Sequence, residues 1–273
     1  MYADHIGRTE ARSGRVWPPL PRDLAAALDR PAPEALPPLR HWTLFQDWRL
    51  PRELGPDGHP RRGGFPPSVH DLPRRMWAGG RVRFHAGSTP RAGDEATRSG
   101  TITGVSDTTG ASGRLVCVTV RHESGPAGFA ITEEQDLLYR GTRGAAAKQA
   151  TPAPPAPGHA SRAEVAPDSV SLFRSSALTG NGHRIHHDLD DASRHEGYPG
   201  PVVHGPLQAT WLAESVARHR PGRRIASFGL RGRRPAFAGR PMVLEGSEGG
   251  DALRLRTLDA DGAVGMDAEV GLG

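Results

Sequence analysis

Long apolar runs are absent from this 273-residue chain, and cysteine and aromatic residues are scarce. No segment approaches the ~20 apolar residues that a membrane-spanning helix needs, and the N-terminal sequence MYADHIGRTEAR lacks the apolar stretch of a secretory signal. The single cysteine, Cys117, excludes an intrachain disulfide, and its place in the strand-like run LVCVTV predicts a buried structural thiol. We therefore expect a cytoplasmic protein with no membrane partner.

Aromatic residues make up only 5% of the chain, so a core must be built mainly from Val, Leu, Ala and Ile. The 35 Gly and 26 Pro indicate many turns and linkers. The formal net charge is +5, which favours anionic partners. The basic residues are nearly all Arg and are scattered through turns, without a basic block or a nucleic-acid-binding signature. We expect no nucleic-acid partner, whereas Arg suits phosphates and carboxylates because its planar fork binds them bidentately.

The clearest boundary is the Ala/Pro-rich stretch 141–167, which reads as an extended linker between segments 1–140 and 168–273. The first segment predicts a short helix at 24–29, a helical or mixed stretch at 41–50 and a long ordered loop at 51–75. Strand patterns separated by turn residues then follow at 80–87, 96–106, 114–124 and 128–140.

The second segment repeats this logic. One strong amphipathic helix is predicted at 206–220, with Pro206 suited to its first turn. Strands are predicted at 170–178, 225–233, 241–246, 252–259 and 264–272. A weak internal repeat, in which strand, Pro and turn Gly recur around Pro90–Gly93 and Pro235–Gly239, suits two copies of a small α+β domain.

Polar, titratable residues crowd the segment LTGNGHRIHHDLDDASRHEGYPGPVVHGP, residues 178–206. Metal binding is one interpretation, because His183 and His187 have the i, i+4 spacing that shares a helix face. No Glu lies between them, and GHRIHHD is poor helix, so we expect no metal site. A solvated surface loop is the second interpretation, and it suits His187, Asp190, Asp191, Arg194 and His195. It suits the residues around the apolar Ile185 less well, namely Asn181, Arg184 and His186.

Acid–base work on water is the third interpretation. A neutral imidazole can take a proton from water and return one to carbon, and a nearby amide can orient that water. The chain then reaches the helix start, where the free N–H of Gly205 can face an oxygen that gains negative charge during reaction. These parts suit the hydration of a double bond conjugated to a thioester.

The motifs LTGNGHRIHHD and EGYPGPVVHGPLQATWL resemble the MaoC-like, or type 2, hydratases and hydroxyacyl-thioester dehydratases. Within them the match is closest to the mesaconyl-C4-CoA (3-methylfumaryl-CoA) hydratase group. The first segment agrees in HIGRTEAR, LGPDGHPRRGGFPP, LPRRMWAGGRVRFH, RAGDEATRSGTI and AITEEQDLLYR. The resemblance covers nearly the whole chain except 141–167. It implies a double hot-dog fold in which 1–140 is a degenerate, dehydratase-like half and 168–273 carries catalysis.

The resemblance also implies roles for single residues. The family motif D-x-N-P-x-H lies over Asn181–His186, so His186 is the implied acid/base, and Asn181 replaces the Asp and would orient water. The nearest carboxylate in sequence is Asp188. The family's His-Gly pair falls on His204 and Gly205, which makes the Gly205 N–H the implied oxyanion donor and places His204 at the substrate.

Two departures from the group concern His187 and Asp191, where aromatic residues are expected, and they bear on substrate preference. Arg184, Arg233 and Arg234 are candidates for binding an anionic part of the substrate. The expected activity is that of a hydro-lyase that converts mesaconyl-C4-CoA into citramalyl-CoA. The alternatives are a 3-hydroxyacyl-ACP or -CoA dehydratase of fatty-acid or polyketide metabolism and a non-catalytic acyl-thioester-binding protein. We expect no cofactor, because CoA is part of the substrate, and a monomer or homodimer.

Overall fold

The computed structural model describes residues 2–33, 36–61, 65–69, 71–85, 90–110, 113–125, 130–141, 151–156, 161–249 and 252–273. Across these residues ten strands form one sheet in which every pairing is antiparallel. The strands are β1 (Thr9–Arg15), β2 (Arg74–Phe84), β3 (Glu95–Gly110), β4 (Gly113–Gly125), β5 (Ile131–Arg140), β6 (Ser161–Val165), β7 (Ile225–Gly232), β8 (Met242–Gly249), β9 (Ala252–Leu258) and β10 (Val264–Leu272).

The order of the strands across the sheet is β1-β3-β4-β5-β2-β7-β10-β9-β8-β6, which is the same arrangement written twice. In chain order, the first strand of each half, β1 or β6, lies at an outer edge of the sheet, and the second, β2 or β7, lies at its centre. The two central strands, β2 and β7, pair with each other and align Val82 with Phe228. The two halves therefore share one continuous sheet and face each other around its middle.

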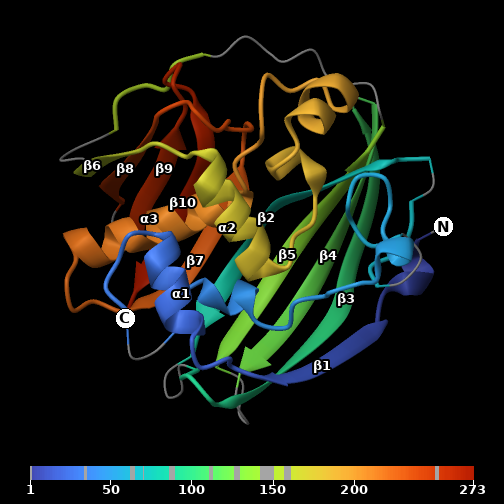
Figure 1. Cartoon of the computed structure of the whole chain (residues 1–273), viewed down its shortest axis with the longest axis horizontal. Helices are drawn as coiled ribbons and strands as arrows, with labels where there is room; N and C mark the ends of the chain where they lie inside the picture. Colours follow the sequence, from blue (N-terminus) through green and yellow to red (C-terminus); the bar gives the residue numbers. More distant parts are fainter. Residues whose placement is uncertain are drawn as a thin grey trace.

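Three helices lie on one face of the curved sheet (Figure 1): α1 (Leu20–Ala27), α2 (Ser169–Thr179) and α3 (Gly205–His219). α3 packs on β8, β9 and β10. Its inner face includes Leu212 and Val216, and the core between helix and sheet also contains Phe228 and Val270. Each of these side chains is at most 1% exposed, so this core stabilises the position of α3 strongly. The α+β class is confirmed, and α3 begins within one residue of its predicted start.

Residues 170–178, predicted as a strand, form most of α2. The Asp168 side chain accepts a hydrogen bond from Ser171 N at 2.7 Å, which caps the helix, and Gly180 ends it at φ 62°. Leu172 and Ser176, four residues apart, form its buried side. The strand prediction was wrong because the signals that define this helix are its two caps, which lie outside the apolar run.

The expected linker also needs correction. Residues 161–165 within it form β6, which pairs with β8 at the edge of the sheet and so belongs to the second half. Residues 142–150 and 157–160 of the linker lie outside the described residues. The division into domains at 140 and 168 otherwise remains a prediction.

Smaller differences concern the first half. The helix expected at 24–29 spans residues 20–27. Of the stretch 41–50, only residues 41–43 are helical, as part of the turn η2 (Arg40–Thr43). Strand β1 was not predicted. Cys117 on β4 is a free thiol, half-buried rather than buried. No helix in the described ranges combines the length and the apolar character needed to span a bilayer.

Candidate active site

The segment 178–206 leaves α2 and returns to the start of α3 through two short helical turns, η4 (Arg184–His186) and the π-helical η5 (Asp191–His195). Its first bend is held by Asn181, whose side-chain oxygen accepts a hydrogen bond from His183 N at 3.0 Å. This Asx-type turn explains why a polar residue follows the capping Gly180. The bend directs His183 and His186 inward.

His186 is 8% exposed, and its Nδ1–H donates to the carbonyl oxygen of Val202 at 2.7 Å. Because a carbonyl can only accept, this bond fixes the tautomer and leaves Nε2 as the basic nitrogen. Burial lowers the pKa of His186 to about 3, and the neighbouring imidazole of His183 contributes in the same direction. The ring is therefore neutral at pH 7 and can accept a proton.

His204 stacks on His186, with ring centroids 3.6 Å apart and planes 17° apart. Its Nε2 lies 2.9 Å from Ser176 Oγ of α2, and no partner for its Nδ1 occurs in the described part of the chain. Burial above all, and then His186, lowers the pKa of His204. His204 is only 2% exposed, so its ring packs against the ring of His186 from the protein interior. This position makes direct substrate binding by His204 less favourable than the resemblance implied.

Gly205 is the first residue of α3, where the backbone N–H has no intrahelical acceptor. We find no acceptor for it elsewhere among the described residues. A β carbon here would lie 2.8 Å from Cε3 of Trp77 on β2, so the position requires glycine. The first half of the chain therefore forms one wall of the site at the start of α3.

The three candidate arginines all have protein partners. Arg184 donates to Asp188 at 2.7 and 3.0 Å and to the carbonyl of Pro56 at 3.1 Å. Arg233 is ion-paired with Asp267 of β10, and Arg234 lies 3.7 Å from Asp259. Arg184 thus anchors the segment to the first half, and we interpret it as structural.

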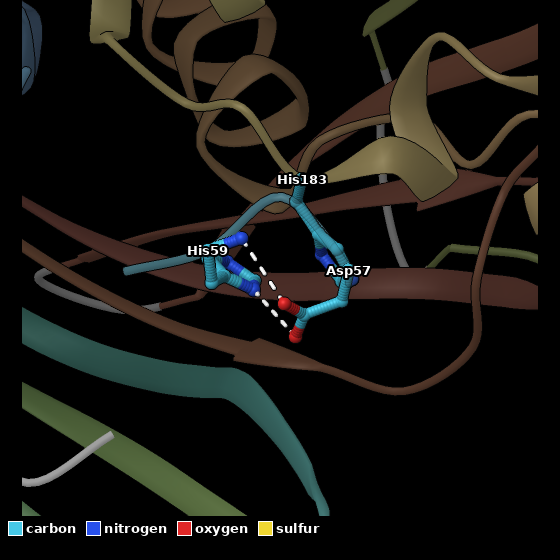
Figure 2. Close-up of side chains that lie close together, drawn as sticks. All are labelled: Asp57, His59 and His183. Atoms are coloured by element: carbon cyan, nitrogen blue, oxygen red, sulfur yellow. Dashed lines mark hydrogen bonds and ion pairs between the residues drawn. The ribbon is translucent and has the colours of Figure 1, made fainter. Parts of the chain in front are cut away.

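Asp57 and His59, from the long loop that precedes β2, lie beside His183 and were missed by sequence reasoning (Figure 2). Asp57 accepts hydrogen bonds from His59 N at 3.1 Å and from His59 Nδ1 at 3.3 Å. The ring of His59 is 4.1 Å from that of His183, which in turn meets His186 edge-on at 5.5 Å. The carboxylate nearest the histidines in space is thus Asp57, while Asp188 is engaged by Arg184.

One local signal marked this loop: Gly55-Pro56-Asp57-Gly58 has the composition of a tight turn, and Gly58 N does bond to Gly55 O at 3.0 Å. That pattern indicates a turn but not what the turn contacts. The donor atoms of Asp57, His59 and His183 all lie within 4.8 Å of one another, a spacing that also suits a cation. Since His59 Nδ1 already points at the Asp57 carboxylate, we interpret the pair as hydrogen-bonded.

The surface interpretation holds for most of the residues to which it was applied, since His187, Asp190, Arg194 and His195 are exposed. It was wrong for Asp191, which is 6% exposed. Its carboxylate lies 3.6 Å from Arg184 and 3.5 Å from His195, so the buried charge is compensated.

Two hollows in the described part of the structure lie outside the candidate catalytic residues, because neither is lined by Asn181, His186 or Gly205. A groove of about 930 Å³ on the sheet, lined by residues such as Arg81, Cys117, Arg231 and Arg256, contains none of the candidate catalytic residues. A small apolar cavity of about 40 Å³ lies between α1, α2 and the first turns of α3, against Pro206 and Leu207. Its size suits a substituent of a few atoms.

Comparisons with known proteins show the family to which this chain belongs. The model of the family "hydroxyacyl-thioester dehydratase type 2" matches residues 39–238. The mesaconyl-C4-CoA hydratase of Chloroflexus aurantiacus is 43% identical over 279 residues, covering 98% of this chain and 96% of that protein.

Solved structures show the same fold. A MaoC-like dehydratase from Phytophthora capsici superposes with a TM-score of 0.72 at 16% identity, covering 100% of this chain and 98% of the other. A Mycobacterium tuberculosis protein described as a double hot-dog fold superposes with a TM-score of 0.59 at 14% identity, covering 97% and 95%. The double hot-dog prediction is confirmed, and the chain belongs to the hydroxyacyl-thioester dehydratase type 2 family of hydro-lyases.

Proposed function

We propose that this protein adds water, without a cofactor, to a short enoyl-CoA that carries a second carboxylate, and that mesaconyl-C4-CoA is hydrated to citramalyl-CoA. The observation that carries the proposal is the buried, neutral His186, which stacks on His204, the residue that directly precedes the free N–H of Gly205. The 43% identity to a mesaconyl-C4-CoA hydratase supports the substrate.

His186 moves the protons in this mechanism. Its Nε2 takes a proton from water as the water oxygen bonds to the β carbon of the substrate. The electrons of the double bond pass to the thioester oxygen, which forms an enolate. His186 then returns the proton to the α carbon, so that one molecule of water is added and the enzyme is regenerated.

Gly205 and Asn181 serve the two other requirements. The Gly205 N–H, at the positive end of the α3 dipole, donates to the enolate oxygen and stabilises the negative charge that develops there. The oxygen of Asn181 is already bonded to His183 N, so its amide NH₂ is the group left to orient water.

Arg75 is the arginine best suited to the second carboxylate. It lies on β2 two residues before Trp77, on the strand face that meets Gly205, and its charge acts on His183. Unlike Arg184 and Arg233, it has no ion-pair partner within the described residues. A half-buried, unpaired guanidinium is suited to bidentate binding of a carboxylate.

A thioester panel assayed in both directions tests the proposal. Hydration is measured by the loss of enoyl-thioester absorbance. The wild-type protein should hydrate mesaconyl-C4-CoA faster than long monocarboxylic enoyl thioesters. The His186→Ala variant should keep its fold but show no hydration. Unchanged activity in His186→Ala would sink the assignment. Preference for long 3-hydroxyacyl-ACP or -CoA substrates would favour a dehydratase. Tight binding without turnover would instead indicate an acyl-thioester-binding protein.

A further inference from the structure

The loop 55–59 of the first half is docked onto the catalytic segment by its backbone. Arg184 N donates to the carbonyl of Asp57 at 2.9 Å, and Arg184 Nη1 donates to that of Pro56 at 3.1 Å. Gly58 has φ 83°, and a β carbon on it would overlap the carbonyl oxygen of Gly182. Only glycine fits there. This close contact sets where Asp57 and His59 lie relative to the histidines of the second half.

Four imidazoles follow one another through the site, and we call them the histidine row: His59, His183, His186 and His204. Successive ring centroids are 4.1, 5.5 and 3.6 Å apart. Asp57 holds the first ring through Nδ1, and Ser176 lies against the last. Figure 2 shows Asp57, His59 and His183 gathered at the first end of the row.

A positive charge in this row is costly. Burial lowers the pKa of both His183 and His186 to about 3. The charged and titratable neighbours that act most strongly on His183, His186 and His204 are His59, His187, Arg75 and Asp57. Asp57 is the anion among them, and it favours a proton on His183. Burial works against its charge, yet the hydrogen bonds from His59 keep the pKa of Asp57 below its ordinary range.

We infer that Asp57 and His59 are positioning residues of the hydration, which stabilise the positive charge that forms on the row when His186 takes the proton from water. This inference rests on the proposed function. The two residues replace, from the other half of the molecule, the carboxylate that the family motif carries where this chain has Asn181. The first half therefore supplies part of the acid–base apparatus as well as a wall of the pocket.

Asp57→Asn is the test, because the amide keeps the shape and the backbone docking but removes the charge. We expect kcat for mesaconyl-C4-CoA to fall roughly 30-fold, with KM within about threefold. The solvent deuterium isotope effect on kcat should rise, since proton transfer becomes more limiting. His59→Gln should behave similarly. Glu53→Gln is the matched control. This exposed carboxylate lies two residues before the loop 55–59 and accepts a hydrogen bond from Leu50 N, so its loss should leave kcat and the isotope effect unchanged.

Thermal unfolding of each variant separates a catalytic effect from misfolding. The inference is supported if Asp57→Asn melts within a few degrees of the wild type and shows the lower kcat and larger isotope effect. It is overturned if kcat stays within threefold, or if it falls only together with the melting temperature. Wild-type activity that is lost with EDTA and restored by Zn²⁺ also overturns it, in favour of a cation at the cluster. A wild-type protein that hydrates no thioester overturns the proposed function itself.

Discussion

Trp77 and Gly205 belong to different halves of the chain, yet the indole ring lies against the α carbon of Gly205 so closely that no β carbon fits between them. Trp77 is in turn held edge-on by Trp42, with ring centroids 5.6 Å apart. Trp77 of the first half thus fixes the position of the Gly205 amide, which we propose donates to the enolate oxygen. A continuous sheet joined at β2 and β7 makes this contact possible.

Gly205→Ala is expected to reduce both stability and turnover. The added methyl would lie 2.8 Å from Trp77, so either the ring or the start of α3 must move. We expect kcat to fall roughly 100-fold and the free energy of unfolding to drop by about 1–3 kcal/mol. Urea unfolding and steady-state kinetics measure the two effects.

Gly200→Ala is the control for that substitution, because a β carbon at Gly200 meets open space. A second variant, Trp77→Leu combined with Gly205→Ala, should recover part of the lost stability by relieving the overlap. Because alanine keeps the backbone N–H, the substitution can act only by moving this amide. Gly205→Ala with unchanged kinetics and stability would therefore contradict the tight fit of Gly205 against Trp77.

Asn181 is expected to need its amide as well as its oxygen. Asn181→Asp keeps an acceptor for His183 N, and therefore the turn, but it loses the NH₂ donor that we assign to water. We expect kcat to fall about tenfold or more with an unchanged melting temperature. Asn181→Ala should lose turn stability in addition. Equal kcat for Asn181→Asp and wild type would show that a carboxylate, as in the family motif, serves there as well as the amide.

Arg75→Leu should change which thioesters are used. KM for mesaconyl-C4-CoA should rise by about tenfold to 100-fold, because a charged hydrogen-bonded pair with the carboxylate is lost. KM for crotonyl-CoA, which has no second carboxylate, should stay the same. Arg233→Leu, which breaks only the pair with Asp267, should leave both values unchanged. If instead KM for mesaconyl-C4-CoA rose in Arg233→Leu and stayed the same in Arg75→Leu, Arg233 would be the residue that binds the carboxylate.

His122, buried on β4 away from the site, should make the fold sensitive to acid. Burial lowers its pKa to about 4, and Arg98 contributes in the same direction. The unfolded chain then binds more protons than the folded one between about pH 6.5 and 4, so stability is full above about 6.5 and is lost as the pH falls.

Between pH 7.5 and 5.0 this residue should cost about 1–2 kcal/mol of unfolding free energy, a loss that His122→Gln should not show. Urea titrations at the two pH values measure it. The exposed His85→Gln should retain the wild-type difference. An identical pH dependence in wild type and His122→Gln would contradict the assignment.

Most of the second half was predictable because its signals are local. The apolar spacing of 206–220 and the alternation in β7, β9 and β10 are properties of neighbouring residues, and they place the helix and the strands. The motif over Asn181–His186 and the Gly205 helix start then led to the site. Local signals failed at α2, where the caps outweighed a strand-like pattern, and at β6, which exists because β8 offers it an edge.

The sequence alone therefore determined the fold class, and it directed attention to the segment 178–206, for which we propose acid–base chemistry. The tertiary structure decided which groups surround that segment. Asp57 and His183 are far apart in the chain, and no periodicity or spacing relates them. They meet because the two halves close one sheet around α3 and because Gly58 packs directly on Gly182. The family motif has a carboxylate where this chain has Asn181. Here the carboxylate beside His183 is that of Asp57, which the order of residues could not reveal.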